Sequence, residues 1–290
     1  MRTLTAALSA LLLALAPAPG GAQGSGGTRG VEWLGPRPPA APRRVVSLAP
    51  SLTDTVVALG KASLLVGVTR YDDAPEVARL PRVGGFLDPS PEAIVALRPD
   101  LVLWLTDGGA MPPIEQLAKL GIPVLAVPVV SVADALGCAR AVGDALGDAR
   151  AGERLARSLS HRVEEARRHT AARPRVRVMF VVGRDPLVVA GPGSYPDELL
   201  RLAGGENVVT SSRPWPVYPL ERAVADDPAL LIDAAVLEPP SGLARLEAIP
   251  AVKRGAVYRL RDDSALRPGP RLARALDELG RALAAGGAPP

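Results

Sequence analysis

A long charged stretch at residues 148–172 constrains the fold more than any other part of the chain. Leu155, Leu159 and Val163 recur at a spacing of four, and arginine, glutamate and histidine fill most of the other positions. This pattern predicts one helix with a narrow apolar stripe that lies over other structure. About 25 residues at about 1.5 Å each make a helix roughly 37 Å long, which is enough to bridge two domains. An ordinary surface helix has the same local pattern, so the interpretation as a bridge depends on the flanking sequence.

Short apolar runs alternate with helical segments on both sides of this stretch. The runs are RVVSL, LLVGV, DLVLWL and PVLAV before it, and RVRVMFVV, LLIDAAVL and AVYRL after it. Such alternation is typical of parallel strands joined by crossover helices. We therefore predict an α/β protein with two Rossmann-like α/β lobes, at 43–147 and 173–290, joined by one long rigid helix at 148–172, with the ligand cleft between the lobes. Further helices are expected near 195–204, 219–227, 242–249 and 268–284.

The N-terminus predicts export. Residues 1–22 contain one arginine, an apolar run and then small residues up to Ala22, the composition of a cleavable signal peptide and too short for a transmembrane helix. The only cysteine, Cys138, lies far from the cleavage site and has small apolar neighbours. We therefore expect a buried thiol, no lipid anchor, and a monomeric periplasmic protein that is not membrane-embedded. Residues 23–42 form a Gly/Pro-rich leader with little to pack beyond Trp33.

The charge of the chain does not favour nucleic-acid binding. The formal net charge is +4, of which the predicted signal peptide contributes one arginine. Basic and acidic residues are interspersed rather than gathered in a patch, so we expect no nucleic-acid partner.

Two segments resemble each other across the predicted lobes. PEAIVALRPDLVL begins at residue 91 and PLERAVADDPALLI begins at 219, and each places a glutamate seven residues before a proline and a strand. Glu92 follows Ser90 and Pro91, and this sequence is typical of the start of a helix. Earlier in the chain, the spacing of Ser51 and Asp54 also predicts a helix start. Glu92 and Glu221 each lie in a first turn, where a carboxylate simply complements the helix dipole. Matched acids on two lobes also suit a two-point contact with a basic partner.

No catalytic or metal-binding constellation is visible. The two histidines lie eight residues apart on the charged helix, and the chain has no GxSxG, HExxH, P-loop or paired-cysteine motif. We therefore predict no enzyme activity, no catalytic residues, no metal site and no cofactor. A tetrapyrrole-processing enzyme remains an alternative class, which would require a histidine or cysteine in the cleft. A scaffold-like interaction module is another, which would not need aromatic residues there.

The few aromatic residues are more informative. Tyr71, Phe86, Trp215 and Tyr218 lie in predicted loops beside prolines or glycines. The simplest explanation is that each ring covers the edge of the hydrophobic core of its own lobe. Alternatively, the rings face the cleft and offer flat apolar surfaces to a large ligand, because such folds bind ligands at the carboxyl ends of parallel strands. Three arginines in similar loops are candidates to meet acid or amide groups of that ligand: Arg70, Arg184 and Arg213.

Several motifs carry a family resemblance. RVVSLAPSLTDTVVALG, VGVTRYDDAPEVARLPRVGGFLDPSPEAIVALRPDLVL and LLRLAGGENVVTSSRPWPVYPLERAVADDPALLI resemble the periplasmic binding proteins of ABC importers for vitamin B12, haem and ferric siderophores, and most of all the vitamin B12 branch. The resemblance implies two lobes joined by one rigid helix, with the ligand between them. It also implies that Tyr71, Phe86 and Trp215 surround the ligand and that Glu92 and Glu221 dock onto the permease.

Two departures weaken the assignment of the ligand. Trp104 falls one position before the tryptophan of the B12 branch and should point to the other side of its strand, and residues 261–271 lack that branch's aromatics. From the resemblance as a whole we predict a small-molecule carrier that delivers a corrinoid to an ABC importer's permease and ATPase complex. Haem or a ferric siderophore is the alternative, with Tyr71 or Tyr218 as a possible haem ligand.

Overall fold

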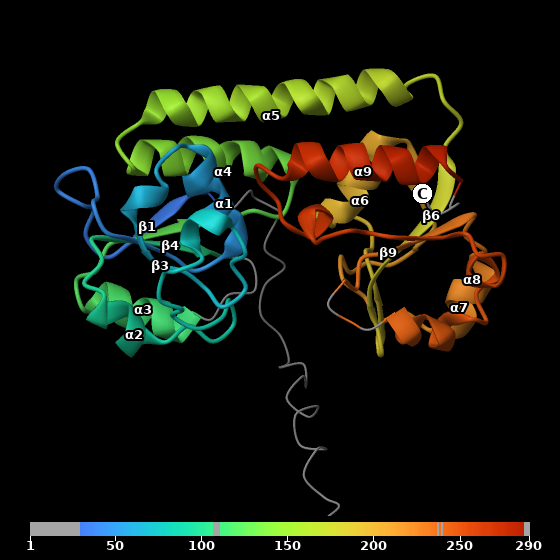
Figure 1. Cartoon of the computed structure of the whole chain (residues 1–290), viewed down its shortest axis with the longest axis horizontal. Helices are drawn as coiled ribbons and strands as arrows, with labels where there is room; N and C mark the ends of the chain where they lie inside the picture. The colour runs from blue at the N-terminus through green and yellow to red at the C-terminus, as the bar shows by residue number, and fades with distance from the viewer. Residues whose placement is uncertain (1–29, 107–110, 237, 239, 287–290) are drawn as a thin grey trace, which may run out of the picture.

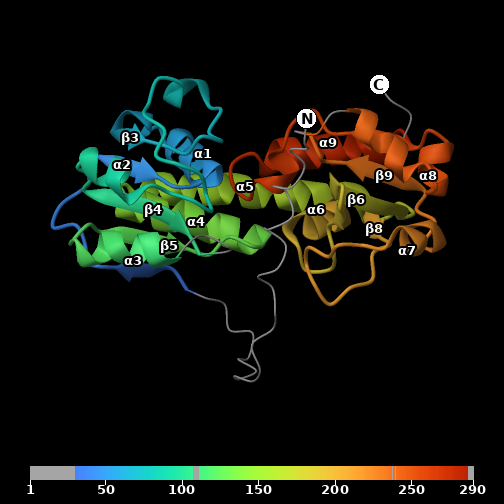
Figure 2. The same ribbon diagram turned by 90° about the horizontal axis from the view of Figure 1, so that it is seen from below.

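The computed structural model describes residues 30–106, 111–236, 238 and 240–286. Two α/β lobes lie side by side beneath one long helix, α5 (Ala149–Thr170), as Figure 1 shows. Seen from below, in Figure 2, the lobes are separate bodies with α5 running behind both. The predicted fold class is therefore confirmed. Helix α5 covers nearly the whole 148–172 stretch, and the side chain of Asp148 caps its first turn by accepting from the Ala151 N–H.

The N-terminal lobe is a five-stranded sheet in the order β1-β5-β4-β2-β3. All its pairs are parallel except β1 with β5. The strands are β1 (Glu32–Leu34), β2 (Val45–Ser47), β3 (Leu65–Gly67), β4 (Leu101–Leu105) and β5 (Val124–Val127). The helices described in this lobe are α1 (Pro50–Ala58), α2 (Pro91–Ala96), α3 (Met111–Lys119) and α4 (Val132–Ala145).

The C-terminal lobe has the sheet order β10-β9-β6-β7, and β8 pairs in parallel with β6. Among the described strand pairs of this sheet, β6–β7 is antiparallel and the others are parallel. The strands are β6 (Val176–Arg184), β7 (Leu187–Val189), β8 (Gly205–Asn207), β9 (Leu230–Asp233) and β10 (Val257–Arg259). The α-helices of the lobe are α6 (Tyr195–Ala203), α7 (Leu220–Ala225), α8 (Pro250–Lys253) and α9 (Leu272–Ala284).

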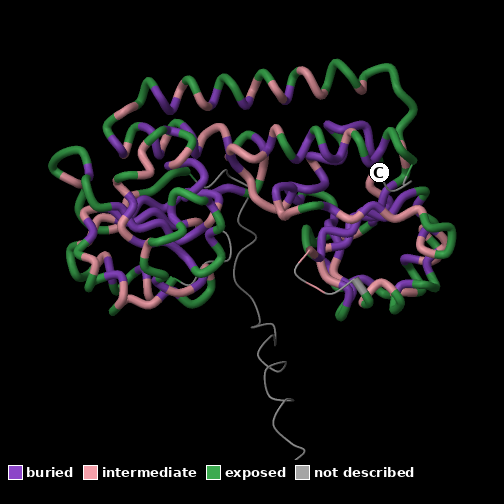
Figure 3. Tube along the Cα trace, in the orientation of Figure 1, coloured by how far each residue is buried: buried purple, intermediate pink, exposed green. Residues whose placement is uncertain are grey.

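Helix α5 joins the lobes through its narrow apolar stripe. Leu159 and Val163 are buried in the core of the C-terminal lobe, whereas Figure 3 shows much of the outer surface of α5 exposed. Towards the N-terminal lobe α5 packs closely on α4, and a Cβ on Gly143 would come within 2.6 Å of the Gly152 Cα. Glycine is therefore required at that crossing. The connector therefore packs into the cores of both lobes.

The lobes also touch directly beneath α5. The Val132 N–H, at the start of α4, donates to the Glu198 carboxylate of α6 at 2.7 Å. Val132 itself is buried in the core of the C-terminal lobe. This contact crosses between the lobes next to the connector, so it limits how far they can move apart near α5.

Some local predictions were wrong. Helix α1 begins at Pro50 with Ala49 as its N-cap, so Ser51 does not cap it, whereas Ser90 does cap α2 by accepting from the Ala93 N–H. The helix expected near 242–249 is a 3-10 segment at Pro240–Leu246. Within the Gly/Pro-rich leader, β1 adds an edge strand to the sheet, and Arg37 lies 5.7 Å from the ring centre of Trp33. Propensity alone missed this strand because its partner is distant in sequence.

Candidate ligand-binding site

A cavity of about 500 Å³ lies between the two lobes. Its walls are formed at the carboxyl ends of the central strands: Leu105 ends β4, Val182 lies near the end of β6, and Ala234 follows β9. This is where parallel α/β sheets bind ligands. The N-terminal lobe supplies Ala49, Pro50, Ser51, Tyr71, Phe86 and Leu105, and the C-terminal lobe supplies Val182, Ala234, Ala235, Val236, Glu238, Asp263, Leu266, Arg267 and Pro268.

Two of the predicted aromatic residues line this cavity, Tyr71 and Phe86. The cavity is open to solvent near Tyr71, since this residue is 52% exposed. The guanidinium of Arg70 lies 5.5 Å from the centre of the Tyr71 ring. Arg70 is held in turn by an ion pair with Asp88. Tyr71 therefore offers one ring face to a ligand while Arg70 stays beside it, occupied by a carboxylate.

The loop that carries Phe86 approaches Tyr71 because Gly85 has no side chain. A Cβ at Gly85 would lie 2.5 Å from the Asp88 carboxylate and 3.0 Å from the Tyr71 ring. Leu87, next to Phe86, is 68% exposed. Exposed apolar side chains beside an apolar cavity favour a ligand with a large flat or apolar surface.

The C-terminal lobe provides the charged part of the wall, through residues that no sequence motif marks. Arg267 lines the cavity, and its Nε donates to Asp263 at 2.6 Å while its Nη1 pairs with Asp73 of the other lobe at 2.8 Å. Arg271 pairs with Asp73 at 2.6 Å and with Asp54 at 2.7 Å. We call Asp54, Asp73, Arg267 and Arg271 the interlobe network. It ties the lobes together at the edge of the cavity.

The two carboxylates of the interlobe network respond differently to their surroundings. Burial raises the pKa of Asp54 by more than the hydrogen bond and charge of Arg271 lower it. Burial also raises the pKa of Asp73, but hydrogen bonds from Arg271 and Arg267, with their charges, outweigh burial and lower it to about 2. The difference follows from exposure, since the Asp73 side chain is 52% exposed and that of Asp54 only 9%.

Removing the charge of Asp73 should loosen the network in a pH-dependent way. The lowered pKa means that ionised Asp73 stabilises the folded state above its ordinary pKa of 3.8, and that this contribution is lost as the pH falls through about 2. We expect Asp73→Asn to lower the free energy of unfolding by on the order of 1 kcal/mol at neutral pH, after allowance for solvent screening. About half of that difference should be gone at pH 3.

Urea denaturation of both proteins at pH 7, 4 and 3 measures this difference. Asp88→Asn is the matched control, because Asp88 pairs with Arg70 within one lobe and at the surface. Its effect on stability should be much smaller than that of Asp73→Asn at every pH, because the Asp88 pair is exposed and screened by solvent. A pH-independent effect of Asp73→Asn would refute the electrostatic explanation.

The structure does not bring the other predicted residues into the cavity lining. Arg184 has a fully buried side chain paired with Asp233, and Tyr218 is 5% exposed with its hydroxyl donating to Asp226. Both side chains are held inside the C-terminal lobe by carboxylates, and no sequence pattern predicts these pairings. Arg213 and Trp215 lie on an exposed segment of the same lobe, where Trp215 is 46% exposed.

Trp104 points away from the cavity, as the strand alternation predicted. Its ring is 2% exposed and packs with Ile94 and Ile114 on the opposite face of the sheet from Leu103. The neighbouring Leu105 ends its strand at the cavity wall. This part of the cavity wall is therefore formed by Leu105 and not by Trp104.

The two matched acids occupy equivalent places in the two lobes. Glu92 lies in the first turn of α2 and Glu221 in the first turn of α7, and both are exposed. Six residues after each glutamate, the residue before the proline has a positive φ, 46° at Arg98 and 36° at Asp227. The repeated segments thus end their helices alike. In Figure 1 both helices lie on the side of the molecule opposite α5.

Neither metal-binding nor membrane-spanning features occur in the part of the chain that the structure describes. Within it, His, Cys, Asp and Glu side chains do not gather in threes suited to a metal ion. Its helices include none with the length and apolar character needed to cross a bilayer. Burial raises the pKa of the Cys138 thiol to about 12, so Cys138 is an inert core residue, as predicted.

The sequence matches a known family over most of its length. The model of the family described as periplasmic binding protein matches residues 45–264. A vitamin B12-binding protein of Salmonella paratyphi A is 33% identical over 197 residues, which cover 67% of this chain and 73% of the relative. A vitamin B12-binding protein of Vibrio vulnificus is 28% identical over 245 residues, which cover 83% of this chain and 90% of the relative.

Solved structures share the fold. A periplasmic haem-binding protein from a Roseiflexus species has a TM-score of 0.77 and 27% identity, over 85% of this chain and 99% of its own. The periplasmic vitamin B12 binding protein of Vibrio cholerae has a TM-score of 0.75 and 24% identity, over 85% and 98%. At that identity the second similarity supports the fold alone.

Proposed function

The chain belongs to the periplasmic binding protein family, and from that premise we propose that it captures a corrinoid and delivers it to the permease of an ABC importer. The observation that carries this proposal is the cavity between the lobes, lined by Tyr71, Phe86 and apolar strand ends and bordered by charged groups. Relatives named as vitamin B12-binding proteins support the choice of ligand. Tyr71 and Phe86 are the primary contacts in this proposal.

The role is binding without catalysis. Both histidines lie on α5, and Cys138 is buried in the N-terminal lobe, so none of these groups belongs to the cavity wall. The wall instead combines apolar side chains with a few fixed charges, an arrangement that holds and orients a ligand. Export by a cleaved signal peptide at residues 1–22 and the absence of a lipid anchor remain part of the proposal. The signal segment lies outside the described residues.

A haem carrier is the second candidate. Structural relatives at 27% to 29% identity are periplasmic haem-binding proteins. Tyr71 is the phenol at the cavity, and Arg267, which Asp263 and Asp73 hold in place, adds a cation to its wall. Tyr71 rather than Tyr218 is the haem ligand in this candidate, because the Tyr218 hydroxyl donates to Asp226 inside the C-terminal lobe. A ferric siderophore requires the same kind of cleft.

Titration of the mature protein with cyanocobalamin and, separately, with hemin tests the proposal. We expect saturable one-to-one binding of cyanocobalamin in calorimetry and by quenching of tryptophan fluorescence. Binding of hemin alone would transfer the function to the haem candidate. Binding of neither would refute both ligands while leaving membership of the family intact.

Replacing the cavity aromatics should weaken the ligand complex without unfolding the protein. Tyr71→Ala and Phe86→Ala should each raise the Kd for cyanocobalamin roughly tenfold, because each removes about 1–2 kcal/mol of ring contact. Trp215→Ala should have a smaller effect, since Trp215 lies outside the cavity lining. Calorimetry gives the Kd values and thermal melts check folding. An unchanged Kd for Trp215→Ala would remove Trp215 from the proposed site.

A further inference from the structure

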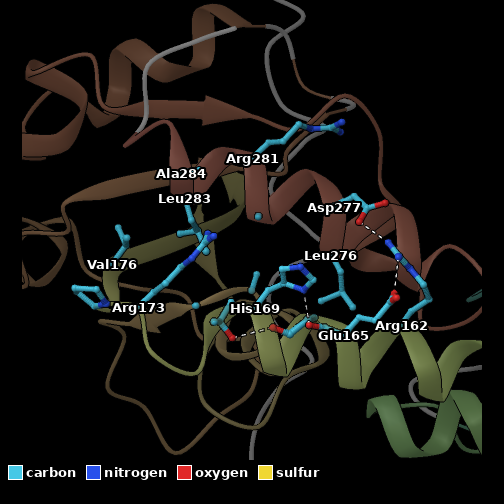
Figure 4. A pocket seen from close by; sticks show the side chains of 16 residues that line it. Arg162, Glu165, His169, Arg173, Val176, Leu276, Asp277, Arg281, Leu283 and Ala284 are labelled. Atoms are coloured by element: carbon cyan, nitrogen blue, oxygen red, sulfur yellow. Dashed lines mark hydrogen bonds and ion pairs between the residues drawn. The ribbon is translucent and has the colours of Figure 1, made fainter.

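A second cavity lies in the C-terminal lobe, away from the ligand cleft. It measures about 460 Å³ and runs between the C-terminal half of α5 and α9, as Figure 4 shows. We call it the α5–α9 groove. It shares no lining residue with the cleft between the lobes. Its apolar surface comes from Ala166, Val176, Leu276 and Leu283.

The charges around the groove are unevenly neutralised. At one end Arg162 donates to Glu165 at 2.7 Å and to Asp277 at 2.6 Å, so two acids and one arginine are already paired. Toward the other end Arg173 extends over the groove in Figure 4. No ion pair to Arg173 or Arg281 is present among the residues that the structure describes. That end therefore carries the positive charge of Arg173, and no carboxylate among the described residues pairs with it.

His169 lies between these two ends. Its Nδ1 is 2.8 Å from the Glu165 carbonyl oxygen, which can only accept, so Nδ1 carries the proton and the ring is fixed in orientation. The ring then presents its face and its Nε2 to the groove, as Figure 4 shows. A molecule in the groove meets apolar side chains beneath it, a flat ring beside it and an arginine at one end.

We propose that the α5–α9 groove binds an amphipathic anion, a molecule with a compact apolar body and one acid group that pairs with Arg173. The apolar floor accounts for the body and the unpaired arginine end accounts for the acid. The occupant would contact α5, which joins the lobes, and α9, which begins directly after Arg271 of the interlobe network. This site is independent of the proposed corrinoid site.

Gly280 allows the groove to be filled without disturbing the fold. It lies in α9 and lines the groove, and a Cβ built on it meets no heavy atom within 4 Å. Leucine at this position should fill the groove, and it should not destabilise the helix because leucine favours helix over glycine. Gly137 in α4 has the same open surroundings and lies outside the groove, so Gly137→Leu is the matched control.

The test uses two fluorescent probes that differ in charge. We expect 1-anilinonaphthalene-8-sulfonate to bind at one site with a Kd on the order of tens of micromolar. Its uncharged analogue N-phenyl-1-naphthylamine should bind about tenfold more weakly. Arg173→Gln should remove this preference, Gly280→Leu should abolish saturable binding, and Gly137→Leu should bind as the parent does.

Three results would overturn the proposal. The first is unchanged binding by Gly280→Leu, which would place the probe elsewhere. The second is equal affinity for both probes in the parent protein, which would show a groove with no preference for anions. The third is binding that appears only in a chain ending at Gly286, which would show that the groove holds the chain's own C-terminus.

Discussion

Reversing the charge of both docking acids, Glu92→Arg with Glu221→Arg, should abolish ligand uptake while leaving ligand binding intact. The two glutamates are exposed, and neither lines the cavity between the lobes. They lie on equivalent helices, α2 and α7, on the side opposite α5 (Figure 1). A basic partner that contacts both would lose two attractive contacts and meet two repulsive ones, each costing several kcal/mol at a desolvated interface.

The measurement pairs uptake of radiolabelled ligand, by cells that depend on this protein, with calorimetry on the purified variant. Each single reversal should reduce uptake at least tenfold, and the double reversal should leave none above background. Glu153→Arg with Glu164→Arg is the matched control, because it changes the net charge equally but lies on α5. Normal uptake by the docking variant, or loss of its ligand affinity, would contradict the docking role.

The architecture was predictable because its signals are local and repeated. The apolar stripe of Leu155, Leu159 and Val163 marked α5. Leu159 and Val163 are among the residues that α5 buries, and Leu155 is partly buried. The alternation of strand and helix marked both lobes. Matches to the periplasmic binding protein family confirm the resemblance inferred from the motifs.

The repeat between the lobes was visible in the sequence, and the structure shows which backbone features the two copies share. Each copy ends its helix with a left-handed residue before proline, and each copy's C-terminal carbonyls accept from an arginine of a neighbouring strand region. Arg44 donates to the Leu97 carbonyl at 2.7 Å, and Arg177 donates to the Asp226 carbonyl. The shared backbone geometry holds Glu92 and Glu221 in equivalent settings.

The charged parts of the site were less predictable because their partners are far apart in sequence. Arg267 and Asp73 are 194 residues apart, so no local pattern joins them. In the sequence, residues 261–271 stand out only by their lack of aromatics, yet they contribute the charged cavity wall and the ion pairs to the other lobe. Similarly, nothing near Arg184 in sequence indicates that Asp233 neutralises it.

Removing the buried Arg184 should therefore destabilise the protein strongly rather than weaken a ligand contact. Its Nη2 lies 2.6 Å from one Asp233 oxygen and its Nε 3.2 Å from the other, and both side chains are fully buried. These residues end strands β6 and β9, and the segment after Asp233 forms the cavity wall at Ala234 and Ala235. Arg184→Met leaves a buried carboxylate without its main partner, which costs about 3–5 kcal/mol.

Urea denaturation of Arg184→Met should show that loss, and combining it with Asp233→Asn should recover most of it, because the pair is then neutral. Arg245→Met is the matched control, since Arg245 pairs with Asp185 on the surface of the same lobe. Its effect should stay below about 1 kcal/mol. If Arg184→Met kept its stability and lost only ligand affinity, Arg184 would be a ligand contact after all, and the buried pair would not be what holds this wall of the cavity.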